Sequence, residues 1–213
     1  MMPWLFLATV ALVFLLLMGS ELWWRKRRPD SELSRKFVHL TVGSFVAFWP
    51  FFLSWNEIRI LSAAFIVVVL LSKWLNIFQA IHSVQRPTWG EIYFALVVGL
   101  LTFVTHSKSI YAAALLQMSL ADGMAAIVGV EYGIKRGKEY LVFGHPKTLI
   151  GTLTFLLISW AILFGYSADV SRLSLVYVAS FGAGAAIIEN LAVAGLDNLL
   201  VPLVIAAALT ALH

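Results

Sequence analysis

Long runs of apolar residues, separated by short polar segments, determine what this chain can fold into. A bilayer crossing needs about 20 mostly apolar residues, so a chain of 213 residues has room for about eight crossings with short loops. The runs lack the alternation of a membrane β-barrel, and backbone groups in hydrocarbon must be satisfied within their own segment, which favours helices. We therefore predict an all-α, polytopic integral membrane protein with one transmembrane domain over residues 1–213. The predicted spans are about Pro3–Met18, Lys36–Leu53, Ile58–Leu75, Glu91–Thr105, Ile110–Val130, Leu149–Phe164, Leu173–Ile188 and Leu199–Leu212.

The composition supports this class and excludes several kinds of site. Hydrophobic residues make up 61% of the chain and charged residues 12%, with a mean hydropathy of +0.91. The chain has no cysteine, which excludes disulfides, thiolate metal sites and a cysteine nucleophile. We interpret the net charge of +4 as a sign of topology and anionic lipid, with no nucleic acid partner. Pro3–Met18 lacks the flanks of a cleaved signal, so we expect a retained span.

The basic residues predict the orientation. Twelve of the 15 lysine and arginine residues flank the odd-numbered connections between spans, and cytoplasmic loops carry such an excess. We therefore expect the odd-numbered connections in the cytoplasm and both termini outside. The twelve are Arg25, Lys26, Arg27, Arg28, Arg35, Lys36, Lys73, Arg86, Lys135, Arg136, Lys138 and Lys147, and the other three are Arg59, Lys108 and Arg172.

Ionisable residues in or near the spans are the main functional candidates, because hydrocarbon rejects charge unless it is paired or used. On the predicted topology all of them lie at or near the cytoplasmic side. That placement favours a site open to the cytosol over a conduit across the membrane. The residues are His39, Glu91, Asp122 and Glu189 in or at the edge of spans, with Lys147 and Asp197 close by.

Helical spacing suggests how some of these groups meet. Small residues recur on the same helix faces as Asp122 and Glu189, and such stripes allow close helix packing. Two carboxylates brought together where helices cross, plus a phosphate, could hold Mg²⁺. The two stripes are Asp122, Ala126, Gly129 and Gly133, and Gly182, Ala186 and Glu189. Arg35, His39 and Gly43 also share one helix face, which carries a positive charge and an imidazole.

The segment Gly144–Thr152 is the best phosphate-binding candidate, since it leads directly into the sixth span. Pro146 suits a helix start, and Lys147 and Thr148 would place an ammonium, a hydroxyl and free N–H groups there.

Purely structural interpretations stay open at this point. Asp122 could be a neutral acid hydrogen-bonded between helices, and His39 a satisfied interior histidine. Glu189 could cap its helix or pair with Lys147 or Arg35. The glycine stripe is interpreted mainly as packing, and Arg25–Arg28 as a topogenic cluster that faces lipid.

Five patches in order, from Arg35 to Leu203, resemble the CTP-dependent polyprenol kinases. This family includes dolichol kinase, phytol kinase and the CTP-using diacylglycerol kinase, and it is similar to the phosphatidate cytidylyltransferases. One departure is Ile150, which stands where the family usually has Glu. The patches are Arg35-Lys36-x-x-His39, Gly90-Glu91-x-Tyr93-Phe94, Asp122-x-x-Ala125-x-x-x-Gly129-x-x-x-Gly133, His145-Pro146-Lys147-Thr148-x-x-Gly151-Thr152, and Glu189 with Asp197-Asn198-x-x-Val201-Pro202.

The resemblance implies a catalytic domain that transfers the γ-phosphate of CTP to a membrane isoprenoid alcohol. The expected Mg²⁺ ligands are Asp122 and Asp197, with Glu189 as a third. Glu91 or His39 would act near the acceptor hydroxyl, and Asn198 joins the site through the last patch. The predicted nucleotide-binding set is Lys147, Thr148, the Gly151 backbone, Arg35 and Lys36 for attraction of the triphosphate, and Gly129 and Gly133.

Three alternatives remain from the sequence. A cytidylyltransferase would transfer CMP from CTP to a phospholipid acid, although the Asp-Asn-x-x-Val-Pro ending favours a kinase. An ion-coupled transporter would also explain acids inside spans, but it should carry polar groups through both leaflets. A non-catalytic scaffold would not need the set of Asp122, Lys147 and Asp197. The sequence also leaves the choice of alcohol, CTP against other nucleotides, and a homodimer open.

Overall fold

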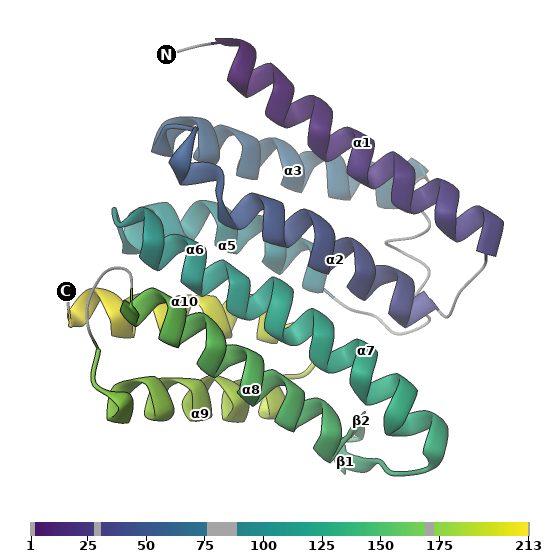
Figure 1. Ribbon diagram of the computed structural model, residues 1–213. Coiled ribbons are helices and arrows are strands. Elements are labelled where there is room, and N and C mark those ends of the chain that lie inside the picture. Colours follow the sequence, from purple (N-terminus) through teal and green to yellow (C-terminus); the bar gives the residue numbers. More distant parts are fainter. Residues whose placement is uncertain (1–2, 28–30, 76–88, 169–172, 213) are drawn as a thin grey trace.

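The computed structural model describes residues 3–27, 31–75, 89–168 and 173–212, and this part of the chain is mostly helical (Figure 1). The helices are α1 (Pro3–Arg27), α2 (Ser31–Ala47), α3 (Trp55–Leu75), α5 (Gly90–Val104), α6 (Lys108–Leu116), α7 (Asp122–Tyr132), α8 (Leu149–Tyr166), α9 (Leu175–Leu191) and α10 (Asp197–Ala211). The remaining elements are the short turns η1 (Trp49–Phe51), η2 (Gln117–Ala121) and η3 (Ile134–Arg136), and the strands β1 (Tyr140–Val142) and β2 (His145–Lys147).

Each predicted span overlaps helix in the structure, but length supports a membrane crossing for only some of them. Within the described residues, four segments are long and apolar enough to cross: Trp4–Trp23, Trp55–Ser72, Lys108–Arg136 and Leu149–Tyr166. The apolar helices α5, α9 and α10 have 15 to 17 residues, which makes the shortest of them roughly 22 Å long. The hydrocarbon core is about 30 Å thick, so eight crossings stay a prediction.

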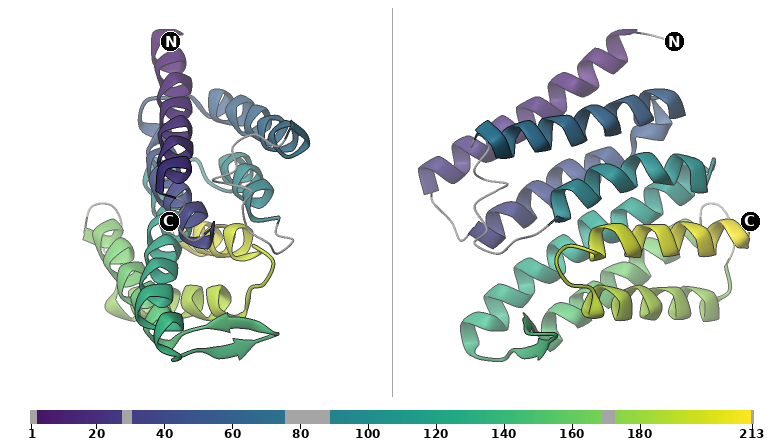
Figure 2. Two further views of the ribbon diagram at one scale, coloured as in Figure 1. Left: turned by 90° about the vertical axis from the view of Figure 1, so that its right-hand side faces the viewer. Right: turned by 180° about the vertical axis from the view of Figure 1, so that it is seen from behind.

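With α6, η2 and α7 taken as one continuous helix, successive described helices run in opposite directions. The first residue of α1 and the last of α10 lie at the same end of the bundle, and the β1–β2 hairpin lies at the other end (Figures 1 and 2). We call the end with the hairpin the hairpin end and the opposite end the far end. The starts of α2, α5, α8 and α10 are all at the hairpin end, so residues early in these helices come close together.

The segment Lys108–Arg136 is the central helix of the bundle. In its most apolar stretch 61% of the residues are buried, against 22–28% for the other three long spans. Tyr111 is fully buried there, and its hydroxyl donates to the Val98 carbonyl at 3.1 Å. The outward faces of α1, α3 and α8 instead expose large apolar side chains, as expected of helices that face lipid.

A wide π-helical turn, η2, interrupts this central helix directly before Asp122. Such turns hold one residue more than an α-turn and are often found at functional sites. Two side chains of the turn are hydrogen-bonded: the Gln117 amide donates to the Ser159 carbonyl at 3.3 Å, and Ser119 donates to the Leu115 carbonyl at 3.0 Å. Asp122 is the first residue of the helix that follows the turn.

The prediction that Pro146 begins a helix is wrong. Pro146 lies in β2, paired with Leu141 of β1, and the helix begins at Leu149 with Thr148 as its N-cap. Phe143 and Gly144, with φ of 47° and 79°, form the tight turn that pairs the two strands. The sequence places the polar residues of this segment correctly but misses the hairpin that carries them.

Candidate functional site at the hairpin end

Lys36 joins two of the predicted acids. Its ammonium nitrogen lies 2.5 Å from Asp122 Oδ2 and 3.9 Å from Asp197 Oδ2. Lys36 comes from the first half of α2, Asp122 follows the wide turn, and Asp197 is the first residue of α10. Lys36 and Asp122 are both buried, with 5% and 4% of their surface exposed. Lys36, which we expected to attract the triphosphate, is held between two carboxylates.

Lys147 and Glu189 form a second ion pair. The Lys147 ammonium donates to Glu189 Oε1 at 2.6 Å and to the Glu189 main-chain carbonyl at 2.8 Å. Lys147 is the last residue of β2, and Glu189 lies in the last turn of α9. A cation there is also favoured by the negative end of the helix dipole. The pairing of Glu189 with Lys147, one of the structural interpretations left open by the sequence, is present.

The two ion pairs belong to one electrostatic cluster. Asp122 interacts with Lys36, His39 and Lys147, so both lysines act on it. Glu189 interacts with Asp122 and Asp197 as well as with Lys147. Acids from three distant segments and two lysines therefore lie near one another at the hairpin end. The cytosol-facing pocket that the sequence predicted for Asp122, Lys147, Glu189 and Asp197 stays a prediction.

Glu91 and His39 lie at the edge of this cluster. Glu91 is buried in the first turn of α5, and the His39 ring packs against Phe94, 4.8 Å between ring centroids. Asn198 donates to the Gly90 carbonyl at 3.0 Å, which ties the start of α10 to the start of α5. The Asn198 Oδ1 atom is buried with no hydrogen-bond partner among the described residues. Asn198 thus positions Glu91 next to the helix start that carries Asp197.

The predicted glycines and Thr148 pack α7 against α8. A Cβ on Gly129 would lie 2.9 Å from Thr148 Oγ1, and a Cβ on Gly133 only 2.4 Å from Thr148 Cγ2. The Thr148 hydroxyl accepts from the Gly151 N–H at 3.1 Å, so the N–H that we assigned to a phosphate serves the helix cap here. These contacts fix the hairpin, and with it Lys147, against the end of α7.

Sequence reasoning missed a polar cluster beside Lys147. The Asn190 amide donates to the Tyr140 hydroxyl at 2.5 Å and to Thr152 Oγ1 at 2.8 Å, and these two oxygens lie 3.1 Å apart. Asn190 follows Glu189 directly, which is the signal that could have found it. Ile150, which replaces the family's usual Glu, is exposed at 41%. The Arg35 side chain lies outside the described part of the structure, so its predicted role stays a prediction.

At the predicted metal site, the Lys36 ammonium lies between the two acids Asp122 and Asp197. Within the described residues, no group of three or more histidine, aspartate or glutamate side chains could hold a metal ion by itself. Asp122 and Asp197 nevertheless turn oxygens toward the same ammonium, and two carboxylates with phosphate oxygens make a usual Mg²⁺ environment. Their donor chemistry therefore fits Mg²⁺ bound together with a nucleotide, and the predicted third ligand, Glu189, is engaged by Lys147.

Comparison with known proteins identifies the family. Neither a protein-family model nor a solved structure gives a significant match to the chain. A curated protein from Synechocystis sp. (strain PCC 6803), phytol kinase, is 35% identical over 193 residues, which cover 86% of this chain and 81% of that protein. Since the likeness spans most of both chains, this protein belongs to the family of polyprenol and phytol kinases.

Proposed function

We propose that this protein is a prenyl-alcohol kinase that transfers the γ-phosphoryl group of CTP to an isoprenoid alcohol in the membrane, with phytol as the first candidate. The observation that carries the proposal is the likeness to a phytol kinase over 86% of the chain. The cluster of lysines and acids at the hairpin end supports it, because phosphoryl transfer depends on positioning and on neutralising charge.

The cluster supplies the groups that a nucleotide triphosphate needs. Lys147 lies at the end of the hairpin, where its ammonium can neutralise phosphate oxygens. Asp122 and Asp197 would hold Mg²⁺, and the bound ion would neutralise charge on the phosphates. The Lys36 ammonium lies between these two acids, so binding of Mg²⁺ there would require it to move away from Asp122 Oδ2.

The acceptor alcohol would approach from the lipid side. Glu91 or His39 would take the proton of its hydroxyl or orient that group, since His39 interacts with Asp122 and Glu91 follows Gly90, which Asn198 ties to the start of α10. The nucleotide would arrive from the cytosol, so we propose that the hairpin end faces the cytoplasm, as the basic residues indicate.

Position-specific labels test this function and separate it from transfer of CMP. The purified protein is offered CTP or ATP with phytol, farnesol, a longer polyprenol or diacylglycerol, with phosphatidic acid as the acceptor for CMP. We expect label from the γ-phosphate of CTP to enter phytol, and label from the α-phosphate to stay in CDP. Entry of the α-label into phosphatidic acid with release of pyrophosphate would contradict the kinase and favour the cytidylyltransferase. Transfer from ATP alone would remove CTP from the proposal.

A further inference from the structure

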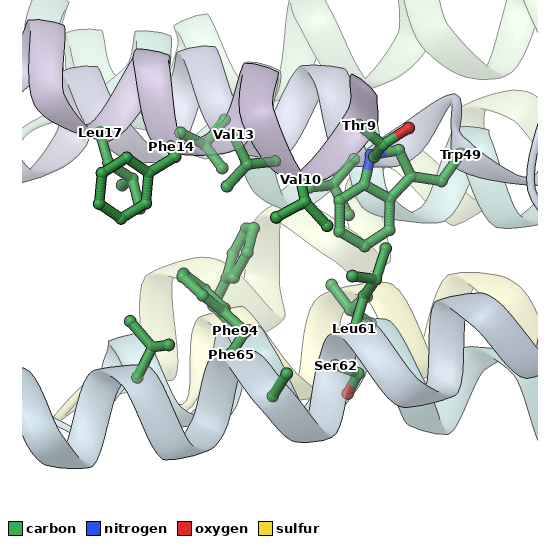
Figure 3. Close-up of a pocket in the computed structure, with 15 residues that line it drawn as sticks. Thr9, Val10, Val13, Phe14, Leu17, Trp49, Leu61, Ser62, Phe65 and Phe94 are labelled. Atoms are coloured by element: carbon green, nitrogen blue, oxygen red, sulfur yellow. The ribbon is translucent and has the colours of Figure 1, made fainter. Parts of the chain in front are cut away.

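An apolar pocket of about 140 Å³ lies between α1 and α3, away from the charged cluster (Figure 3). Side chains of α2 and α5 complete its lining. The two hydroxyl groups in its lining both donate to main-chain carbonyls: Thr9 to Leu5 of its own helix at 2.8 Å, and Ser62 to Ala95 of α5 at 2.7 Å. The pocket therefore offers hydrocarbon, with the indole of Trp49 at one end.

On α2, one helix face leads from the charged cluster into this pocket. Lys36 and His39 lie in the first and middle parts of the helix, and Val42 and Val46 line the pocket further along. These residues are three or four positions apart, so they lie on the same face. The distance along the axis from Lys36 to Val46 is roughly 15 Å, at 1.5 Å per residue.

Helix α5 repeats this arrangement. Glu91 is in its first turn, and Phe94 and Val98 follow at three and seven positions and line the pocket. Phe94 connects the two regions, because its ring contacts His39 at 4.8 Å and Phe65, another lining residue, at 5.9 Å between centroids. Figure 3 shows Leu17 and Phe14 of α1 at the Phe94 side of the pocket and Thr9 near Trp49.

We propose that this pocket receives the isoprenoid chain of the acceptor alcohol while its hydroxyl lies at the level of Glu91 and His39. The inference rests on the proposed function and adds a binding site for the lipid chain. On each of the two helices polar residues precede apolar ones along one face, which matches a molecule with one polar end and a hydrocarbon tail. Continuity through Phe94 favours the substrate chain over a bulk lipid as the occupant.

The size of the pocket limits what it holds. An engineered cavity of about 150 Å³ accommodates benzene, so this pocket holds about one five-carbon unit, and the rest of the chain extends between α1 and α3 toward lipid. The lipid that the isoprenoid chain leaves is as apolar as the pocket, so there is no hydrophobic gain on binding. The binding free energy comes instead from close packing and from the contacts of the positioned hydroxyl. The pocket should therefore determine which alcohols bind and where their hydroxyl group lies.

Two neighbouring alanines of α3 provide a matched test. Ala63 and Ala64 are both exposed, and only Ala64 lines the pocket. We expect Ala64→Phe to lower kcat/KM for phytol about ten-fold without changing the KM for the nucleotide, and Ala63→Phe to leave both unchanged. If both variants are active and have equal kinetic constants, the proposed binding site for the isoprenoid chain is wrong, while the proposed kinase function is unaffected.

Labelling tests the pocket even without activity. A phytol analogue with a photoreactive diazirine on its chain is irradiated with the purified full-length protein in lipid vesicles, and labelled peptides are located by mass spectrometry. We expect labels on the α1 and α3 segments that line the pocket, reduced by excess phytol and by Ala64→Phe. Labels that excess phytol does not displace would show a pocket filled by bulk lipid and overturn the inference. Specific labelling without transfer to any isoprenoid alcohol would instead refute the proposed kinase.

Discussion

The two ends of the helix bundle use charged residues in different ways. At the far end, Glu57 and Ser54 form a reciprocal cap at the start of α3: the Ser54 N–H and hydroxyl donate to Glu57 Oε2 at 2.7 and 2.8 Å. Arg59 donates to the Thr102 hydroxyl at 2.8 Å and lies over the Phe103 ring at 4.1 Å. These charges meet neutral groups and help to hold α3 against α5.

At the hairpin end the charged groups meet each other. Lys36 and Asp122 are 86 positions apart in sequence, and Lys147 and Glu189 are 42 apart. Burying such pairs costs desolvation, and a buried ion pair is weak evidence for stability. The comparison teaches that the far end uses charge for structure, whereas the hairpin end retains a costly cluster that is best explained by function.

The sharpest way to break this comparison is Asp122→Asn. The substitution keeps the shape of the side chain and removes one predicted Mg²⁺ ligand and the partner of Lys36. We expect kinase activity to fall by about 1,000-fold, as on loss of a group that stabilises transition-state charge. The matched control is Glu131→Gln, which removes an exposed ion pair with Lys135 on the same helix and should change activity less than about two-fold. Wild-type activity in Asp122→Asn would show that phosphoryl transfer does not need Asp122.

Removing the hairpin lysine should have the next largest effect. Lys147→Met keeps a side chain of similar length but removes the positive charge that pairs with Glu189 and would contact a bound phosphate. We expect the KM for the nucleotide to rise about 30-fold, since a charge-assisted contact contributes on the order of 2 kcal/mol. Lys108→Met, at the exposed far end of the central helix, should leave this KM unchanged. Equal KM values for the two variants would mean that Lys147 only anchors the hairpin.

The crossing of α7 and α8 gives a third comparison. Gly133→Ala places a methyl group 2.4 Å from Thr148 Cγ2, whereas a Cβ on Gly184 meets nothing within 4 Å. We expect Gly133→Ala to destabilise the protein by about 1–3 kcal/mol and to weaken nucleotide binding by shifting the hairpin. Gly184→Ala should be neutral or slightly stabilising. Thermal unfolding in detergent and nucleotide titration measure both, and two unaffected glycine variants would show that the crossing adapts freely.

The smallest effect is expected at the far end. Arg59→Gln loses the contacts with Thr102 and Phe103, which should lower stability by about 1 kcal/mol. Activity should stay within about two-fold of wild type, because Arg59 has no part in the charged cluster. A large loss of phosphotransfer with intact thermal stability would contradict the division between the two ends.

The helices and the charged cluster were predictable for different reasons. Apolar runs locate helices because each helix buries its own backbone groups, so the signal is local. The cluster followed from one rule, that hydrocarbon excludes unpaired charge, applied to Asp122, Glu189 and Lys147. The capping of α3 was also visible in principle, since Ser54 and Glu57 have the spacing of a capping box.

What the sequence did not reveal depends on contacts between distant segments. It cannot show that Lys36 turns inward between Asp122 and Asp197. The hairpin depends on left-handed backbone at Phe143, which is uncommon outside glycine and has no clear signature. The wide turn at Gln117–Ala121 likewise leaves no pattern in the residue types, because it arises from packing around the central helix.

That wide turn has a consequence for how the family can vary. A residue lost from Gln117–Ala121 would turn the wide turn into an ordinary α-turn and leave the helix on both sides of it in place. A residue lost from or added to the regular helix after Asp122 would instead rotate everything beyond it by roughly 100° and carry Gly133 away from Thr148. A one-residue deletion within the wide turn should therefore be tolerated better than one within Asp122–Tyr132, so the spacing from Asp122 to Gly133 is the stricter constraint.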